Sequence, residues 1–396
     1  MTPVSSDSAE PVLIRTLPLS NGNYGGILQA YALQRVLVDL GLAPVTDLSV
    51  SNPLPPFGKA VARAVLFRMP AWCLRTRAAA EALDSVLADE LAEPLNEFVT
   101  EFVAGVELFS LRGAVDTQLL ARYRTLLVGS DQVWRHRYGD VRSFLFDFVA
   151  DQGVRRVSYA ASFGQDHLEG YSRRLIRSTA ELARRFDSIS VREESAVRIC
   201  AEQWGLAARQ HIDPTLLLTR GDYASVAARG TALSPDCLTY VLDASDRSRA
   251  CVESVCRNGG LRETRLHRRP ASYAEFASAP ARYRRSTVPT WVRAFADARF
   301  VVTDSFHGTA FAIIMNTPFV AIANPGRGAT RFDTLLGTVG LSDRLVSSAE
   351  EAKLTASRAI EWDRVNKVLE RKRGEGIDYL RSALRAPSAA APGRRD

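Results

Sequence analysis

The sequence contains no run of about eighteen or more apolar residues, although hydrophobic residues make up 46% of its 396 positions. A helix needs about twenty consecutive apolar residues to cross a bilayer, so no transmembrane helix is expected. The first residues, MTPVSSDSAE, lack the basic start and apolar stretch of a secretory signal, and we expect no such signal here. The hydrophobic content is high enough for buried cores.

Cysteine is scarce, and its spacing fits neither disulfide bonds nor zinc. The number is odd and no C-x-x-C pair occurs, so we predict no disulfide framework and no structural zinc site. No clustered set of carboxylates, histidines and cysteines indicates another metal, and we expect no cofactor. Reducing cytoplasm is the expected compartment. The five cysteines are Cys73, Cys200, Cys237, Cys251 and Cys256.

The charge balance is only modestly basic. Lysine and arginine number 51 against 44 acidic residues, which gives a formal charge of +7, mostly from arginine. A spread excess of this size fits an anionic small-molecule substrate, or an anionic membrane surface, better than a nucleic-acid face. We therefore expect no nucleic-acid partner.

The length predicts two domains. Strand-loop-helix patterns recur in both halves, which indicates an α/β fold. We place an N-terminal domain at 1–225 with a helical insertion at 51–110, a C-terminal domain at 232–345, C-terminal helices at 346–385 and a disordered tail at 386–396. Residues 268–287, which contain Arg-Arg-Pro and Arg-Tyr-Arg-Arg, are expected to form a basic loop.

The most informative stretch runs from Arg299 to Asn324, RFVVTDSFHGTAFAIIMNTPFVAIAN. Its pattern predicts a buried strand, a polar turn, a helix from Thr309 and a second strand. His307 then lies where the helix begins. Ligands of open α/β sheets bind beyond the carboxyl ends of the strands, and helix N-termini attract anions.

Several residues of this turn are candidates for chemistry. Gly308 has no side chain and would let a ligand approach the backbone. His307 can exchange a proton near neutral pH, although a capping or core role is the alternative. Asp304 could orient His307 or accept a proton, and its alternative role is to cap the helix. The other histidines, at 136, 167, 211 and 267, are interpreted as surface or loop residues.

Polar residues follow other predicted strands as well. The loop that contains Asn23, Tyr24 and Gly25 precedes a helix and could bind an anion or sugar, or be a plain tight turn; it lacks the G-x-G-x-x-G and G-x-x-x-x-G-K-[ST] spacings. Arg192 is placed for a bidentate contact with a carboxylate or phosphate, and equally for a structural salt bridge to Glu193 or Glu194. Asp213 is interpreted as a turn cap.

Taken together, these segments resemble the polysaccharide pyruvyl transferases over about residues 12–340. The matching blocks keep the order of the family: NYGG with LQAYALQ from Asn23, VGSDQVW from Val128, SYAASFG from Ser158, SVRE from Ser190, DPTLL from Asp213, TDSFHGT from Thr303, and the Arg331-Phe332 pair.

The resemblance implies a two-domain fold like that of GT-B glycosyltransferases, with two Rossmann-like domains facing a cleft. It implies phosphoenolpyruvate as the donor, and a sugar of a surface polysaccharide or its lipid-linked precursor as the acceptor. The product would be a pyruvate ketal across two sugar hydroxyls, with phosphate released. A lipid-linked acceptor would bring the protein to the inner face of the membrane. The oligomeric state stays open.

Site residues follow by position. His307 would be the general acid and Arg192 a donor ligand, with Ser305, Gly308 and Thr309 beside them. Some relatives have arginine at the position of Ser305, so another cation must bind the phosphate or carboxylate of the donor. Our candidates are Arg327 and Arg331, while the acceptor would contact Asn23, Tyr24, Gly25, Ser130, Asp131 and Gln132.

Two other function classes remain open at this level, because fold alone does not fix chemistry. One is a nucleotide-sugar glycosyltransferase of the same architecture. The other is a non-catalytic carbohydrate-binding relative, which stays open because Ser305 occupies the position where some relatives have arginine.

Overall fold

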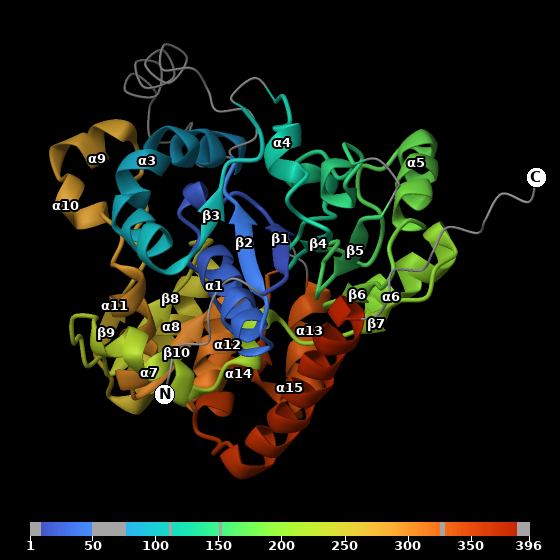
Figure 1. Cartoon of the computed structure of the whole chain (residues 1–396). Helices are drawn as coiled ribbons and strands as arrows, with labels where there is room; N and C mark the ends of the chain where they lie inside the picture. Colours follow the sequence, from blue (N-terminus) through green and yellow to red (C-terminus); the bar gives the residue numbers. More distant parts are fainter. Residues whose placement is uncertain (1–8, 50–76, 111–112, 150–152, 325–328, 386–396) are drawn as a thin grey trace, which may run out of the picture.

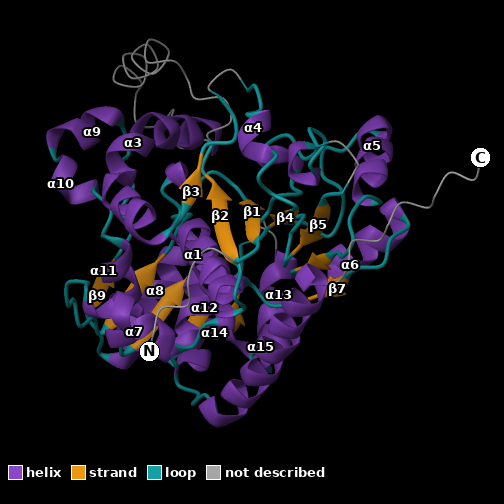
Figure 2. Ribbon diagram, in the orientation of Figure 1, coloured by secondary structure: helices purple, strands orange, loops and turns teal. Residues whose placement is uncertain are grey.

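The structure is a computed structural model that describes residues 9–49, 77–110, 113–149, 153–324 and 329–385 (Figure 1). In these ranges the chain forms two parallel five-stranded sheets, each covered by helices, as Figure 2 shows by colour. The predicted α/β class with two Rossmann-like domains is therefore confirmed. The predicted disordered tail lies outside the described residues.

The first sheet has the strand order β3-β2-β1-β4-β5, so the chain reverses its winding between β1 and β4. All four residues of β4 are buried, as expected for a parallel strand with helices on both faces. A short pair, β6 and β7, extends this sheet through a bridge from Val157 to Ser188. The strands are β1 (Pro11–Arg15), β2 (Ala43–Asp47), β3 (Gly105–Val106), β4 (Thr125–Val128), β5 (Arg155–Ser158), β6 (Ser190–Val191) and β7 (Arg209–Gln210).

The second sheet has the order β12-β11-β10-β8-β9, with its reversal between β8 and β10. Both orders are doubly wound, and ligands of such sheets bind outside the strand ends at the reversal. The strands are β8 (Cys237–Tyr240), β9 (Glu263–Arg265), β10 (Phe300–Thr303), β11 (Phe319–Ile322) and β12 (Leu345–Val346).

Helices surround both sheets. In the first half they are α1 (Tyr24–Asp39), α3 (Arg77–Phe102), α4 (Thr117–Leu120), α5 (Arg173–Ala183) and α6 (Glu194–Ile199). In the second half they are α7 (Arg220–Ala228), α8 (Asp246–Gly259), α9 (Tyr273–Ser278), α10 (Pro280–Tyr283), α11 (Val288–Asp297), α12 (Phe306–Ile314), α13 (Ala329–Val339), α14 (Ala349–Ala356) and α15 (Trp362–Arg385).

The two domains meet at α1 and α12, which lie close together in the centre of Figure 1. Tyr24 of α1 stacks on Trp291 of α11 with ring centroids 5.3 Å apart, and it meets the ring of Tyr240 edge-on. One hydrophobic cluster includes buried residues of α1, α11, α12 and α15. Burial of aromatic rings at this junction fixes how the two sheets face each other.

The last helix, α15, returns from the second domain to the first, where Figure 1 shows its red ribbon passing toward β5 and β6. Arg373 Nε donates a hydrogen bond to the Leu216 carbonyl at 2.8 Å, and the Tyr379 hydroxyl donates to the Ser158 carbonyl at 3.0 Å. Gly376 is required by packing, since a Cβ there would lie 2.5 Å from the Tyr159 hydroxyl. The helix therefore belongs to both domains.

Some expected segments differ from the structure. The described part of the predicted insertion 51–110 includes helix α3, but Gly105–Val106 forms an edge strand of the first sheet. The predicted basic loop 268–287 contains helices α9 and α10. Helix α1 begins at Tyr24, so Gly25 lies in its first turn and not in a loop. The predicted boundary at residue 225 falls inside α7, which packs on α11.

Candidate active site

His307 is the second residue of α12, directly beyond the end of β10. The Ser305 side chain caps this helix by accepting a hydrogen bond from Gly308 N at 3.3 Å. The helix thus begins at Phe306, three residues earlier than the sequence pattern predicted, because a serine N-cap satisfies one of its free N–H groups. The His307 side chain is only 8% exposed and faces the first domain.

The N-terminus of α1 lies against the His307 ring. A Cβ built on Gly25 would come 1.9 Å from His307 Nδ1, a distance that no side chain can accommodate. By contrast, a Cβ on the neighbouring Gly26 would meet nothing nearer than 3.6 Å. Gly25 was expected to contact the acceptor; in the structure its lack of a side chain makes room for the imidazole.

Asp213 of the first domain lies next to the other ring nitrogen. His307 Nε2 is 3.7 Å from Asp213 Oδ2, within ion-pair range but too long for a hydrogen bond. Asp213 follows β7 and caps the turn Pro214–Leu217 through its Oδ1, which accepts hydrogen bonds from Thr215 N and Oγ1. One carboxylate therefore serves both the turn and the site.

Arg192 connects Asp213 to a second carboxylate. Its Nη1 donates to Asp213 Oδ2 at 2.9 Å, and its Nη2 donates to Asp131 Oδ1 at 3.3 Å. The guanidinium also lies 3.8 Å from Glu193 Oε2 and 4.5 Å from the centroid of the Phe306 ring. The alternative of a structural salt bridge is thus realised, with Asp131 and Asp213 as the closest partners.

Arg331 of α13 joins this cluster from the second domain. Its guanidinium carbon lies 5.7 Å from the centroid of the Phe306 ring, so one aromatic ring faces two arginines. Burial, together with repulsion by Arg192, lowers the pKa of Arg331 from 12.5 to about 10. Arg327, the other candidate cation, lies outside the described residues.

The site is buried and its charges are coupled. Burial alone would raise the pKa of the Asp213 carboxyl, but the adjacent His307 and Arg192 lower it well below its ordinary value. In the described part of the chain, His307 Nε2, Arg192 Nε and Glu193 Oε2 are buried without a hydrogen-bond partner. Polar atoms of this kind are uncommon in folded proteins, and three of them at one place are candidates for contact with a ligand.

Asp304 accepts hydrogen bonds from the loop after β8. Its Oδ1 accepts a hydrogen bond from Leu242 N at 2.6 Å, and its Oδ2 accepts one from Asp243 N at 2.9 Å. Asp213 is a carboxylate beside His307, and the role of Asp304 in orienting the imidazole stays a prediction. Through its two hydrogen bonds, Asp304 ties the loop after β10 to the loop after β8.

The remaining residues near the helix start have structural partners. A Cβ on Gly308 would lie 2.3 Å from Thr303 Oγ1, so this glycine is required by packing against the strand and not by room for a ligand. Thr309 Oγ1 donates to the Ser305 carbonyl at 3.1 Å. Donor contacts by Ser305, Gly308 and Thr309 stay predictions.

The residues predicted to bind the acceptor are mostly committed to the fold. The Tyr24 hydroxyl donates to the Ser286 carbonyl at 2.6 Å, and Ser130 Oγ donates to the Ala160 carbonyl at 2.6 Å. Gln132 Oε1 accepts from Arg135 Nη1 at 3.0 Å. Asn23 caps α1 through its side chain, which accepts from Gly25 N, and it is exposed to solvent. Of this group, Asn23 is the residue whose position best suits an acceptor.

Sequence reasoning missed Asp213 as a site residue. A signal was present, because Asp213-Pro214-Thr215 is one of the blocks that resemble the family. His211, interpreted as a surface or loop residue, follows β7 in a loop but is buried between Tyr159 and Tyr379, with its Nδ1 2.8 Å from Ser190 Oγ.

The described residues contain no group of three histidine, cysteine or acidic residues that could hold a metal ion. Nor do they include a helix with the length and apolar character to cross a membrane.

Comparison with known proteins now gives this geometry a context. Among solved structures, the chain is similar to S. aureus MnaA with UDP (9% identity, TM-score 0.48, covering 97% of this chain and 99% of that one). It is similar to UDP-GlcNAc 2-epimerase from Neisseria meningitidis with UDP-GlcNAc (9% identity, TM-score 0.48, covering 95% of this chain and 99% of that one). It is also similar to Medicago truncatula UGT71G1 with UDP-glucose (11% identity, TM-score 0.44, covering 94% of this chain and 98% of that one). At such identities the likeness concerns the fold alone.

No curated protein matches the sequence. The family model for polysaccharide pyruvyl transferase, however, matches residues 23–326. This range is most of the chain, and it contains His307, Arg192 and Asp213, which meet at the junction of the two domains. The chain belongs to the polysaccharide pyruvyl transferase family.

Proposed function

We propose that the protein transfers the pyruvyl group of phosphoenolpyruvate to two hydroxyls of one sugar, in a surface polysaccharide or its lipid-linked precursor. The product is a pyruvate ketal, and phosphate is released. The observation that carries the proposal is the contact of His307 with Asp213, which Arg192 also binds. These residues follow strands of two different domains, as expected for a site that acts on two substrates.

The reaction needs an acid at the methylene carbon of the donor. In the proposed step, His307 gives its proton to this carbon, and the electron pair of the carbon–carbon double bond forms the new C–H bond. The adjacent carbon becomes an oxocarbenium centre, which the first sugar hydroxyl attacks. A general acid of this type contributes about 10²–10⁴-fold to the rate.

The second half of the reaction breaks the bond to phosphate. As the carbon–oxygen bond to phosphate breaks, the second hydroxyl attacks the same carbon and closes the ketal. One hydroxyl proton returns to His307 and the other leaves with the phosphate, so atoms and charges balance without a redox partner. The proposal therefore involves no cofactor.

Asp213 and the two arginines support these steps. The lowered pKa of Asp213 keeps its carboxylate ionised, and this charge balances the imidazolium form of His307. Arg192 and Arg331 both lie near the Phe306 ring and repel each other, so an anion in contact with both guanidinium groups would be stabilised. We assign the phosphate or carboxylate of the donor to this position.

The buried state of these residues has a consequence for binding. Arg192, Asp213 and His307 are each less than a tenth exposed, so a donor enters only when the two domains move apart near α1 and α12. Domain closure that excludes water from the reacting groups is common in transferases. Asn23, at the exposed start of α1, would then face the acceptor.

The deciding experiment is incubation of the purified protein with phosphoenolpyruvate and a panel of nitrophenyl and lipid-linked sugars, read by mass spectrometry for the added ketal. His307→Ala should abolish ketal formation while the circular dichroism spectrum stays unchanged. His167→Ala is the matched control, since that ring is 68% exposed. Turnover of a nucleotide sugar without phosphoenolpyruvate would replace this proposal with glycosyl transfer.

A further inference from the structure

A second polar site lies beside the His307 loop, at the ends of β8 and β9. It is a cavity of about 340 Å³ formed by the loop after β8, the start of α8, the segment after β9 and the helices α9 and α10. Five of its lining side chains are arginines and three are glutamates, which leaves a net charge of +2 with His267 neutral. The arginines are Arg249, Arg265, Arg268, Arg269 and Arg282, and the glutamates are Glu253, Glu263 and Glu275.

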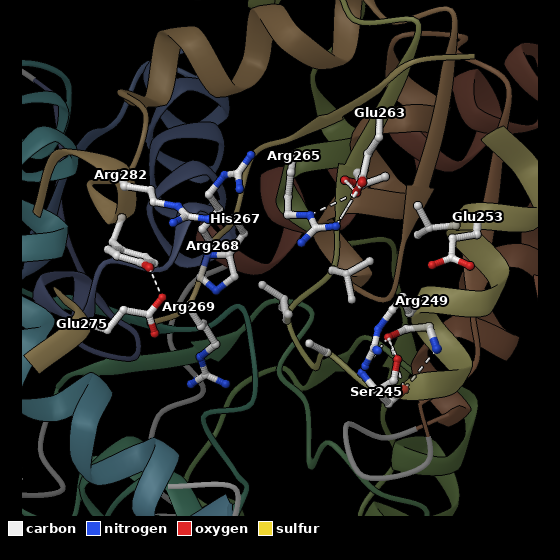
Figure 3. Close-up of a pocket in the computed structure, with 17 residues that line it drawn as sticks. Ser245, Arg249, Glu253, Glu263, Arg265, His267, Arg268, Arg269, Glu275 and Arg282 are labelled. Carbon is white, nitrogen blue, oxygen red and sulfur yellow. Dashed lines mark hydrogen bonds and ion pairs between the residues drawn. The ribbon is translucent and has the colours of Figure 1, made fainter. Parts of the chain in front are cut away.

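The arginines converge from separate elements. Figure 3 shows Arg265, Arg268 and Arg282 on one side of the hollow, and Arg249 with Ser245 on the other. Arg265 is oriented by Glu263, to which its Nε and Nη2 donate hydrogen bonds at 3.0 Å each. Positive charges brought together in this way attract anions.

Two of these cations keep their charge available. Within the described residues, no carboxylate lies within ion-pair distance of Arg268 or Arg282, although Arg282 is near enough to Glu275 to help lower the pKa of that carboxyl, after the hydrogen bonds from Tyr283 and Ala271. Arg282 lies over the ring of Tyr283, with its guanidinium carbon 5.8 Å from the centroid. Tyr283 is held by its hydrogen bond to Glu275, so this wall is fixed in place.

The floor of the cavity adds favourable backbone charge. The fourteen-residue helix α8 begins here, and its capping residues Ser245 and Ser248 both line the cavity. The N-terminus of a helix carries partial positive charge that attracts phosphate groups. Asp246, in the first turn, opposes this effect, but its side chain is 98% exposed and is paired with Arg249.

The cavity is connected to the His307 loop through two contacts. Leu242, which lines the cavity, donates its backbone N–H to Asp304 at 2.6 Å, three residues before His307. Tyr240 contacts the His267 ring on the cavity side, and it lies 3.1 Å from a Cβ built on Gly308. The winding of the second sheet reverses between β8 and β10, so both sites lie where such sheets bind ligands.

The spacing suits one extended ligand. Neighbouring strands are about 4.8 Å apart, so the ends of β10 and β9, with β8 between them, are separated by roughly 10 Å. We infer that this cavity, which we call the arginine cavity, binds the diphosphate of an activated sugar acceptor and directs the sugar toward His307. The acceptor assignment rests on the proposed pyruvyl transfer; the binding of a diphosphate does not.

Binding is tested with inorganic pyrophosphate by isothermal titration calorimetry on the full chain. We expect saturable binding that weakens with added salt and falls at least about tenfold in the double variant Arg268→Gln/Arg282→Gln, because charge-assisted contacts are lost. Arg299→Gln is the matched control: this arginine is 71% exposed and pairs with Asp236, outside the cavity. Absence of binding, or equal binding in the double variant, overturns the inference.

A second measurement identifies the ligand and separates this inference from the proposed function. UDP and farnesyl diphosphate should both compete with pyrophosphate, and the tighter competitor distinguishes a nucleotide-linked from an isoprenoid-linked acceptor. In pyruvyl transfer, we compare the rate with a diphosphate-linked sugar to the rate with a nitrophenyl sugar. This ratio should fall about tenfold in the double variant. If phosphoenolpyruvate displaces pyrophosphate instead, the cavity is a donor site and the acceptor assignment is wrong.

His307→Ala should lose transfer and keep pyrophosphate binding, so failure of one proposal leaves the other measurable.

Discussion

Asp213 of the first domain and His307 of the second lie 3.7 Å apart, measured from carboxylate oxygen to ring nitrogen, and neither is exposed by more than a tenth. Arg192 binds the same carboxylate oxygen from a third strand end. The pair exists only while the two domains are in contact. Its chemistry is therefore coupled to their arrangement.

The first prediction concerns the charge of Asp213. In Asp213→Asn the side chain keeps its size but no longer balances His307 and Arg192. We expect pyruvyl transfer to fall by about 10²-fold or more, because both the acid and the donor cation lose their shared partner. Steady-state release of phosphate measures the rate. Asp39→Asn, whose side chain is 62% exposed and pairs with Arg35 on the same helix, should retain full activity, and equal rates for the two variants would remove Asp213 from the site.

A second prediction uses two adjacent glycines as a matched pair. Gly25→Ala places a Cβ 1.9 Å from His307 Nδ1, whereas Gly26→Ala meets nothing within 3.5 Å. Both positions lie in the first turn of α1, so their effects on helix formation are similar. We expect Gly25→Ala to lose most of its transfer activity and Gly26→Ala to keep it, with similar circular dichroism spectra. Equal activities would mean that the ring has freedom to move.

A third prediction concerns the shape of the Arg192 guanidinium. Lysine in Arg192→Lys keeps the positive charge but cannot contact Asp131 and Asp213 together while lying on the Phe306 ring. We expect the apparent KM for phosphoenolpyruvate to rise about tenfold or more, and the KM for the sugar to change little. Similar changes in both constants would assign Arg192 to general stability and not to the donor.

The fourth prediction is a dependence of stability on pH. Burial lowers the pKa of His211 from 6.5 to about 4. Between these values the unfolded chain binds a proton that the folded chain does not, so the free energy of unfolding should fall as the pH falls from about 6.5 to about 4. One proton accounts for no more than about 1.4 kcal/mol per pH unit.

Denaturant titrations at several pH values measure this effect. His211→Gln can still form a hydrogen bond with Ser190 and should flatten the pH dependence in this window. His167→Gln, at an exposed ring, should not alter it. If the wild-type protein and His211→Gln have the same pH profile, His211 is not the group responsible.

The local pattern predicted much of this architecture. Apolar runs followed by polar turns located β4, β10 and the sites of Arg192 and His307, because strand ends and helix caps depend on neighbouring residues. The partner of His307 could not be predicted from the local sequence pattern. Asp213 lies 94 residues before His307 in the sequence, and their contact depends on how two domains pack.

Asp304 shows that nearness in the sequence is also a poor guide to the contacts of a side chain. Its position three residues before His307 suggested an orienting carboxylate, but sequence distance gave no information on the backbone N–H groups of Leu242 and Asp243, which reach it from a neighbouring strand end. The start of α12 was placed too late for a local reason, since the capping serine lies inside a segment that reads as a polar turn.

The return of α15 to the first domain has a mechanical consequence. This helix is attached to Leu216 and Ser158 on one side and packs on α13 on the other. Any motion that separated the domains at α1 would have to break these attachments or pivot about them. The final described helix, which packs on the turn that Asp213 caps, therefore limits how the two domains can move relative to each other.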